Sequence, residues 1–94
     1  MEKQLNTTQA DELFAAILSL KTVDECKAFL RDLCTLSELL AMTERFQVAK
    51  LVKKNVPYRD ISAQTGSSTT TVTRVAHWLH HGMGGYALVL DRMQ

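Results

Sequence analysis

Apolar residues recur at steps of three and four along most of the chain, which is the spacing of one face of an α-helix. The pattern predicts helices over about residues 8–20, 23–33 and 36–54, a short helix from Pro57, another over about 69–81, and a last one over 86–93. Two starts are marked by capping boxes, Thr22 with Glu25 and Thr35 with Glu38. The predicted fold class is all-α, a helix bundle.

Residues 56–81 have the form of two helices joined by a tight turn. Pro57 suits the first turn of a helix, Gly66 supplies the left-handed conformation that ends one, and Ser67 or Ser68 can cap the next. In the second helix, the apolar face consists of Val72, Val75, Ala76 and Leu79, and the opposite face of Thr69, Thr70, Thr73, Arg74 and His77. This is the sequence form of a DNA-reading helix-turn-helix, although threonines also cap helices and solvate surfaces.

Charge is divided unevenly along the 94 residues. The formal net charge of the whole chain is +1, but residues 1–44 carry −4 and residues 45–81 carry +5. The positive field therefore belongs to the helix-turn-helix and the helix before it, and the weak overall basicity does not exclude nucleic acid. For Lys50, Lys53 and Lys54, the alternative is that they only solvate a helix end and favour its dipole.

Length and a hydrophobic content of 46% predict one domain over residues 1–94. We divide it into N-terminal dimerisation helices (1–34), a long core helix (35–54), the helix-turn-helix (56–81) and a C-terminal turn with a short helix (82–94). The surplus of apolar helix faces predicts a homodimer with a shared core; the alternative is that these faces pack within one chain. No stretch resembles a membrane span or signal peptide, which predicts a cytoplasmic protein with no membrane partner.

Few residues offer other chemistry. Cys26 and Cys34 lie too far apart for a disulfide on one helix and are too few for structural zinc, so we expect two buried thiols. His77 and His81 share a helix face, but two imidazoles do not complete a metal site, and we predict no metal. There is no glycine-rich phosphate loop and no nucleophile beside a base, so we predict no enzyme.

From about Thr35 onward the sequence resembles the Trp repressor superfamily, and most of all its YerC/YecD-type Trp-repressor-like proteins. The resemblance rests on Glu44-Arg45-Phe-Gln-Val-Ala-Lys50, Arg59-Asp60-Ile61, Thr65-Gly66 and Thr71-Val72-Thr73-Arg74. The segment GMGGY followed by ALVLDRM is similar to the YerC branch. The resemblance implies an intertwined homodimer that binds a palindromic operator in double-stranded DNA and regulates transcription, as a repressor. A helical protein–protein interaction adaptor that uses the same face is the rival interpretation.

In that family, the positions of Arg59, Ser62, Thr69, Thr70 and Thr73 face DNA. We expect Arg59, Ser67 and the first-turn amides to hold phosphates, and the three threonines to meet base edges. The predicted DNA-binding set is Arg59, Ser62, Ser67, Ser68, Thr69, Thr70, Thr73 and Arg74.

The family repressor holds tryptophan between two arginines beside a threonine, which implies a possible effector pocket at Arg45, Thr71 and Arg74. Arg45 matches only if the connection to Pro57 is one residue shorter than in the repressor; otherwise Glu44 takes that position. The alternative for Arg45 is a bond to an acid such as Glu38. Val75 would intrude on an indole, so we expect this chain's side chains to fill part of the ligand space. We predict no cofactor and no tryptophan corepressor, and leave any effector unnamed.

Overall fold

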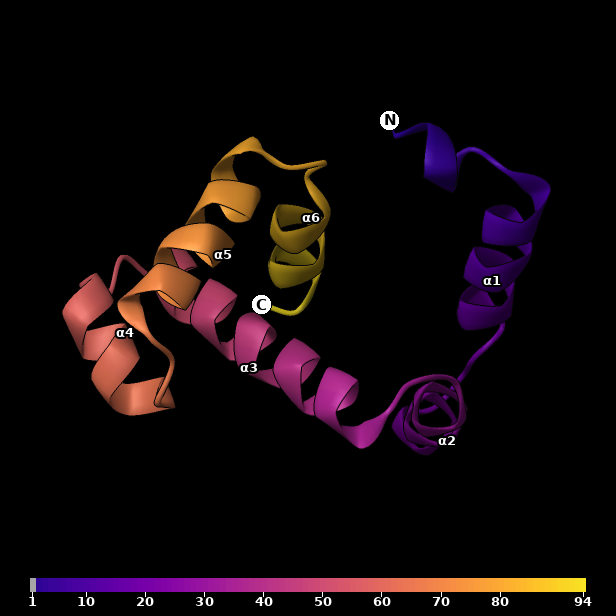
Figure 1. Ribbon diagram of the computed structural model, residues 1–94, viewed down its shortest axis with the longest axis horizontal. Coiled ribbons are helices and arrows are strands. Elements are labelled where there is room, and N and C mark those ends of the chain that lie inside the picture. The colour runs from indigo at the N-terminus through magenta and orange to yellow at the C-terminus, as the bar shows by residue number, and fades with distance from the viewer. Residues whose placement is uncertain (1) are drawn as a thin grey trace. The chain divides into compact units, whose positions relative to one another are not determined.

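The computed structural model describes residues 2–94, and all their regular elements are helices (Figure 1). A short 3-10 helix, η1 (Lys3–Leu5), is followed by α1 (Thr8–Leu18), α2 (Val23–Leu33), α3 (Leu36–Lys53), α4 (Tyr58–Thr65), α5 (Thr69–His81) and α6 (Gly85–Arg92). No strand occurs in residues 2–94, so the predicted all-α fold class is confirmed. None of the helices in this range has both the length and the apolar character needed to cross a membrane.

Polar side chains fix the starts of the first three α-helices. Thr7 caps α1, which the apolar pattern alone did not locate. At α3, Thr35 Oγ1 accepts from the Glu38 amide at 3.1 Å, and Glu38 Oε1 accepts from the Thr35 amide at 2.9 Å, which confirms the predicted capping box. At α2, Glu25 Oε1 accepts from the amide of Lys21, one residue before the cap that was predicted. Both arrangements satisfy amides that would otherwise lack partners at the helix start.

The chain divides into two compact units, Met1–Leu39 and Leu40–Gln94, with the division inside α3. In the first unit, no residue from 2 to 39 is buried. Its exposed apolar residues include Phe14, Ile17, Leu18, Val23, Leu33 and Leu36. Cys26 and Cys34 are free and half-buried, so the expectation of buried thiols was wrong for a single chain. The apolar helix faces found in the sequence are therefore only partly covered here.

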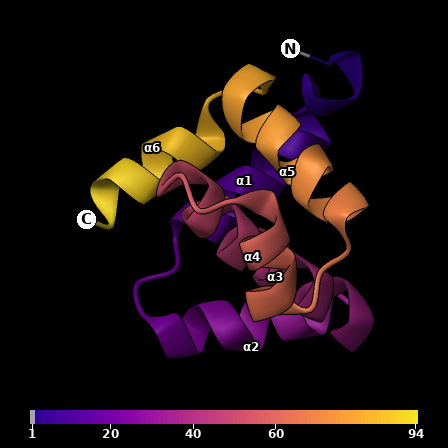
Figure 2. The same cartoon turned by 90° about the vertical axis from the view of Figure 1, so that its left-hand side faces the viewer.

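The second unit contains the hydrophobic core, where the end of α3 packs with α4, α5 and α6 (Figure 2). The buried apolar residues are Val48, Ala49 and Val52 of α3, Ile61 of α4, Val72, Val75 and Ala76 of α5, and Leu90 of α6. Leu79 packs against this core, so the predicted apolar face of α5 is confirmed. Lys53 forms an ion pair with Asp91, which links the end of α3 to α6. The single-domain organisation over residues 1–94 stays a prediction.

Candidate nucleic-acid interface

The turn between α4 and α5 is built as the sequence indicated. Gly66 has a φ of 78°, the left-handed conformation in which glycine has no steric penalty, and its amide donates to the Ser62 carbonyl at 2.9 Å. Of the two candidate serines, Ser68 is the cap of α5, because its Oγ accepts from the Thr71 amide at 3.1 Å. The turn therefore ends one helix and starts the next within three residues, Gly66 to Ser68.

Ser67 and Ser62 lie differently from the prediction. The Ser67 side chain is buried, with 3% exposed, and its hydroxyl donates to Glu44 Oε1 at 2.5 Å. The Ser62 hydroxyl, half-buried on α4, donates to the Ser67 carbonyl at 2.5 Å. Contrary to our prediction, the Ser67 hydroxyl is not placed to reach a phosphate, because it points into the protein. Both serines stabilise the turn in this structure.

The outer face of α5 is polar and exposed. One shallow depression on it is lined by Thr69, Thr70, Thr73, Arg74 and His77, the set that the sequence placed opposite the apolar face. Thr73 Oγ1 donates to the Thr69 carbonyl at 2.9 Å, whereas the Thr69 and Thr70 hydroxyls have no partner within residues 2–94. These two hydroxyls are free to bond with a ligand.

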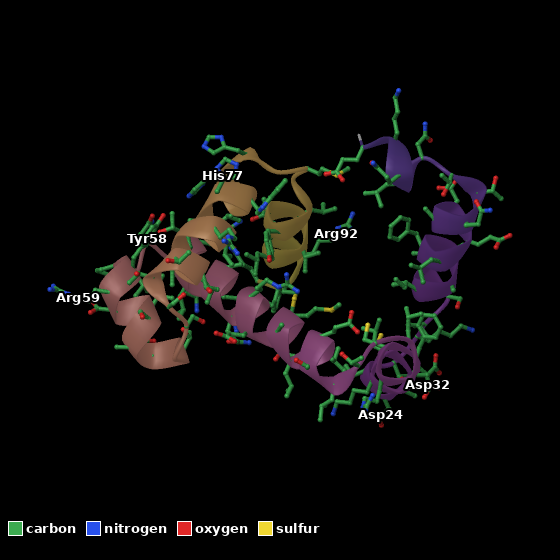
Figure 3. All side chains as sticks on the ribbon, in the orientation of Figure 1. Asp24, Asp32, Tyr58, Arg59, His77 and Arg92 are labelled. Carbon is green, nitrogen blue, oxygen red and sulfur yellow. The ribbon has the colours of Figure 1, made fainter. Side chains whose placement is uncertain are left out.

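Arg59 is exposed on α4 and projects away from the helices of its unit (Figure 3). Ser68, at the start of α5, is exposed as well. Asp60 is the one acidic residue between positions 45 and 81, a stretch that carries a net charge of +5. Of the basic residues in this stretch, Arg59 belongs to α4 and Arg74 to α5, and exposed positive charge attracts polyanions.

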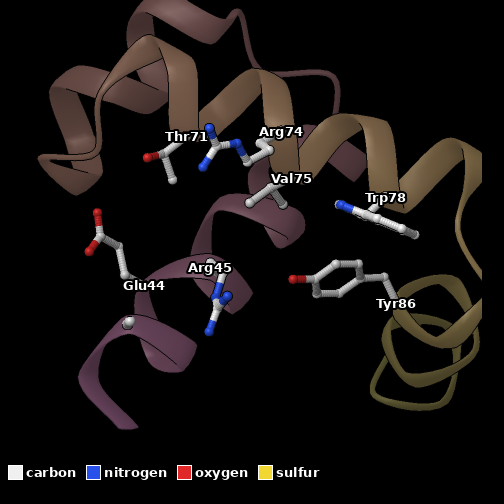
Figure 4. Close-up of a pocket in the computed structure, with 8 residues that line it drawn as sticks. Glu44, Arg45, Thr71, Arg74, Val75, Trp78 and Tyr86 are labelled. Atoms are coloured by element: carbon white, nitrogen blue, oxygen red, sulfur yellow. The ribbon is translucent and has the colours of Figure 1, made fainter. Parts of the chain in front are cut away.

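A pocket of about 500 Å³ lies against another part of α5 (Figure 4). It is lined by Ala41, Glu44 and Arg45 of α3, Thr71, Arg74, Val75 and Trp78 of α5, and Tyr86 of α6. The structure thus brings the predicted effector residues Arg45, Thr71 and Arg74 together. The sequence left open whether Arg45 or Glu44 takes the position of the repressor's arginine. Both residues line the pocket, so the lining does not decide between them. The alternative partner of Arg45, Glu38, instead bonds the Thr35 amide, which holds the pKa of this carboxyl below its usual value.

Val75 forms part of the pocket wall, as expected, but the side chains around it leave the pocket open. Its volume falls within the range of small-molecule sites. Sequence reasoning missed Trp78 and Tyr86 as lining residues; the Trp78 side chain is 52% exposed. Tyr86 is the first large side chain after the glycine-rich turn, and this position was the only sequence signal for it.

The histidines at the end of α5 do not extend into a larger cluster. The rings of His77 and His81 lie 5.3 Å apart, and the ring of His77 also meets Trp78 edge-on at 5.8 Å. Within residues 2–94, no three side chains of the types that ligate metals gather at one place. The polar side chains on the outer face of α5 therefore do not form a group of three metal ligands within the described residues.

Three comparisons with known proteins agree with one another. A sequence model of the Trp repressor protein family matches residues 8–94. The uncharacterized protein YerC of Bacillus subtilis is 38% identical over 91 residues, which are 97% of this chain and 88% of YerC.

Two crystal structures match nearly the whole chain. A TrpR-like protein from Eubacterium eligens has a TM-score of 0.93 and 42% identity, over 98% of this chain and 95% of that one. A Staphylococcus aureus protein described as a candidate Trp repressor has a TM-score of 0.91 and 42% identity, over 97% and 91% of the two chains.

Proposed function

Because the chain belongs to the Trp repressor family, as a YerC-type Trp-repressor-like protein, we propose that it is a transcriptional regulator, a repressor, that binds specific double-stranded DNA through α4 and α5. The observation that carries the proposal is the exposed face of α5, on which two hydroxyls without internal partners lie beside Arg74. A helix start with free amides and short polar side chains fits the major groove.

In this proposal, the residues divide into two roles. The first-turn amides of α5 and the Arg59 guanidinium bind phosphates, which gives affinity and fixes the orientation of the protein. Thr69 and Thr70 offer hydroxyls and methyls to base edges, and Thr73 offers its methyl, because its hydroxyl proton is used within the helix. Ser68 caps α5 at the edge of this surface. In this proposal, Ser62 and Ser67 do not contact DNA; their hydroxyls stabilise the turn.

We further propose that the protein acts as an intertwined homodimer. The support is the first unit, where apolar side chains such as Phe14 (48% exposed) and Leu18 (86% exposed) stay open to solvent in a single chain. A second copy would cover such faces and stabilise both chains through burial of apolar area. A twofold dimer presents two copies of α5, so the operator should be a palindrome with half-site centres about 34 Å apart.

Tryptophan is not the effector in this proposal. Val75 stands in the wall of the pocket, and Glu44 places a carboxylate in the lining that also holds Arg45 and Arg74. In this proposal, Val75 takes up part of the space that an indole ring would need, and the Glu44 carboxylate repels the carboxylate of the amino acid. Calorimetric titration with L-tryptophan should therefore give no binding at micromolar concentrations; micromolar binding together with tighter DNA association would overturn this part of the proposal.

Salt dependence separates DNA binding from the protein adaptor alternative. A duplex enriched from a random pool should bind with a logarithmic affinity that falls by roughly 0.9 per neutralised phosphate for each logarithmic unit of salt. An apolar adaptor groove would not show this slope. Absence of binding to every duplex at low salt would contradict the proposed function.

A further inference from the structure

Ser67 is the point at which the helix-turn-helix is attached to α3. Each of its three polar groups has a partner: the amide donates to Thr65 Oγ1 at 3.2 Å, the carbonyl accepts from Ser62 Oγ, and the hydroxyl donates to Glu44 Oε1. Two of these partners belong to α4, so only the Glu44 bond reaches another helix outside the turn. It joins residues 23 positions apart in the sequence.

The position of Ser67 determines where α5 begins. Ser68, the next residue, is the cap of α5, and its Oγ bonds both the amide and the hydroxyl of Thr71. Thr69 and Thr70, whose hydroxyls are free, follow at once. A displacement of Ser67 would therefore move the first turn of α5, the part that meets base edges in the proposed function. Contacts of this kind depend on geometry held to within about 0.5 Å.

Glu44 has other possible partners, and the structure shows which one it uses. Its side chain lines the same pocket as Arg45 and Arg74, yet within residues 2–94 the single ion pair is Lys53–Asp91. One carboxylate oxygen instead accepts a hydrogen bond from the hydroxyl of buried Ser67. Bonds to charged acceptors are shorter and stronger than those between neutral groups, and a buried hydroxyl without a partner is destabilising.

We propose that Glu44 is a positioning residue for DNA reading: its carboxylate holds Ser67 against α3 and thereby sets the start of α5. This inference rests on the proposed function, since it concerns the face that would read DNA. Glu44 itself need not touch DNA. Its effect passes through Ser67 and Ser68 to the free hydroxyls of Thr69 and Thr70.

The test compares three substitutions at one position in the full chain. Glu44→Gln keeps an oxygen acceptor at the same reach and removes the charge, so it should bind the enriched duplex within about threefold of the original protein. Glu44→Ala removes the acceptor, and Glu44→Asp shortens its reach by one methylene. Each of these two should weaken DNA binding roughly tenfold, the size expected when a hydrogen bond to a charged group is lost.

A second measurement separates positioning from general loss of stability. Hydrogen exchange of the amides from 66 to 71 should accelerate in Glu44→Ala, while the amides of the core segment of α3 around Val48 stay protected as in the original protein. The double variant Glu44→Ala/Ser67→Ala should bind DNA no more weakly than Glu44→Ala alone, because both changes remove the same bond.

Two results would overturn the inference: unchanged exchange and unchanged DNA affinity in Glu44→Ala, or equal losses in Glu44→Gln and Glu44→Ala, which would assign the effect to charge alone. If the original protein binds no duplex, the proposed function fails. The exchange of residues 66–71 in the variants then still reports whether Glu44 holds the turn.

Discussion

Thr70 on α5 is placed to read sequence, because its side chain is exposed and its hydroxyl has no partner within residues 2–94. Thr70→Val keeps the shape and the one methyl group of the side chain and replaces the hydroxyl with a second methyl. We expect a changed base preference at one position of each half-site, with about 0.5–1.5 kcal/mol less binding free energy for the base that the original protein prefers, the size of one neutral hydrogen bond. Binding of a panel of duplexes, each substituted at one base pair, measures this.

Arg59 on α4 is expected to contribute equally to the binding of every duplex, because its exposed guanidinium would bind backbone phosphates and not bases. Arg59→Ala should weaken binding to specific and random duplexes by a similar factor and lower the salt slope by about one. The same duplex panel, titrated at several salt concentrations, checks this. Identical effects of Arg59→Ala and Thr70→Val on every duplex would contradict both role assignments.

For single residues, the sequence predicted which side chains of α5 are exposed, but it wrongly placed the hydroxyls of Ser62 and Ser67 on the DNA-facing surface. Periodicity distinguishes an apolar from a polar helix face, and this assigned Thr70, Thr73 and Arg74 to the outer face. It carries no information on a bond between Ser67 and Glu44, because their pairing depends on how α3 packs against the turn. The pocket residues Trp78 and Tyr86 were missed for the same reason.

Among the helices, local signals predicted the starts, and all ends except that of α1, to within one residue. Thr22 and Thr35 fix the starts of α2 and α3 through bonds within four residues, and Gly66 fixes the end of α4 through its own backbone conformation. The end of α1 was placed too late, at residue 20, whereas the helix ends at Leu18. Ser19 then bonds carbonyls of the preceding turn, an ending for which the apolar pattern gives no signal.

The capping box of α3 makes a prediction about pH. Hydrogen bonds from the Thr35 amide and hydroxyl lower the pKa of Glu38 in the folded chain below its ordinary value of 4.5. A carboxyl with a lowered folded-state pKa stabilises the fold above its unfolded pKa, and this contribution is lost as the pH falls below about that value. The thermal midpoint of Glu38→Gln should therefore lie below that of the original protein at pH 7, and this gap should narrow as the pH falls below 4.5 and through the lowered pKa of Glu38.

A matched control is Glu12→Gln on α1, since Glu12 is exposed and bonds no other side chain in the described part of the chain. It should show a smaller gap at pH 7. A gap between the original protein and Glu38→Gln that grows toward pH 3 would contradict the assigned role of the carboxylate.

For the whole molecule, the exposed apolar side chains of the first unit lead us to expect a dimer. With no buried residue between positions 2 and 39, this part of the chain gains little from its own packing. Sedimentation equilibrium or light scattering should give twice the mass of one chain at micromolar concentration. Phe14→Ser, which places a polar group on the exposed apolar face of α1, should shift the mass toward one chain. A single-chain mass for the original protein at all concentrations would contradict the dimer.

Selection of bound duplexes from a random pool by the 94-residue protein tests directly whether α5 reads DNA sequence. We expect enrichment of one palindromic sequence whose half-site centres are separated by about one turn of duplex, because a twofold dimer would present two copies of the exposed α5 face. A pool that shows no enrichment after repeated rounds at low salt would contradict sequence-specific DNA binding by this protein.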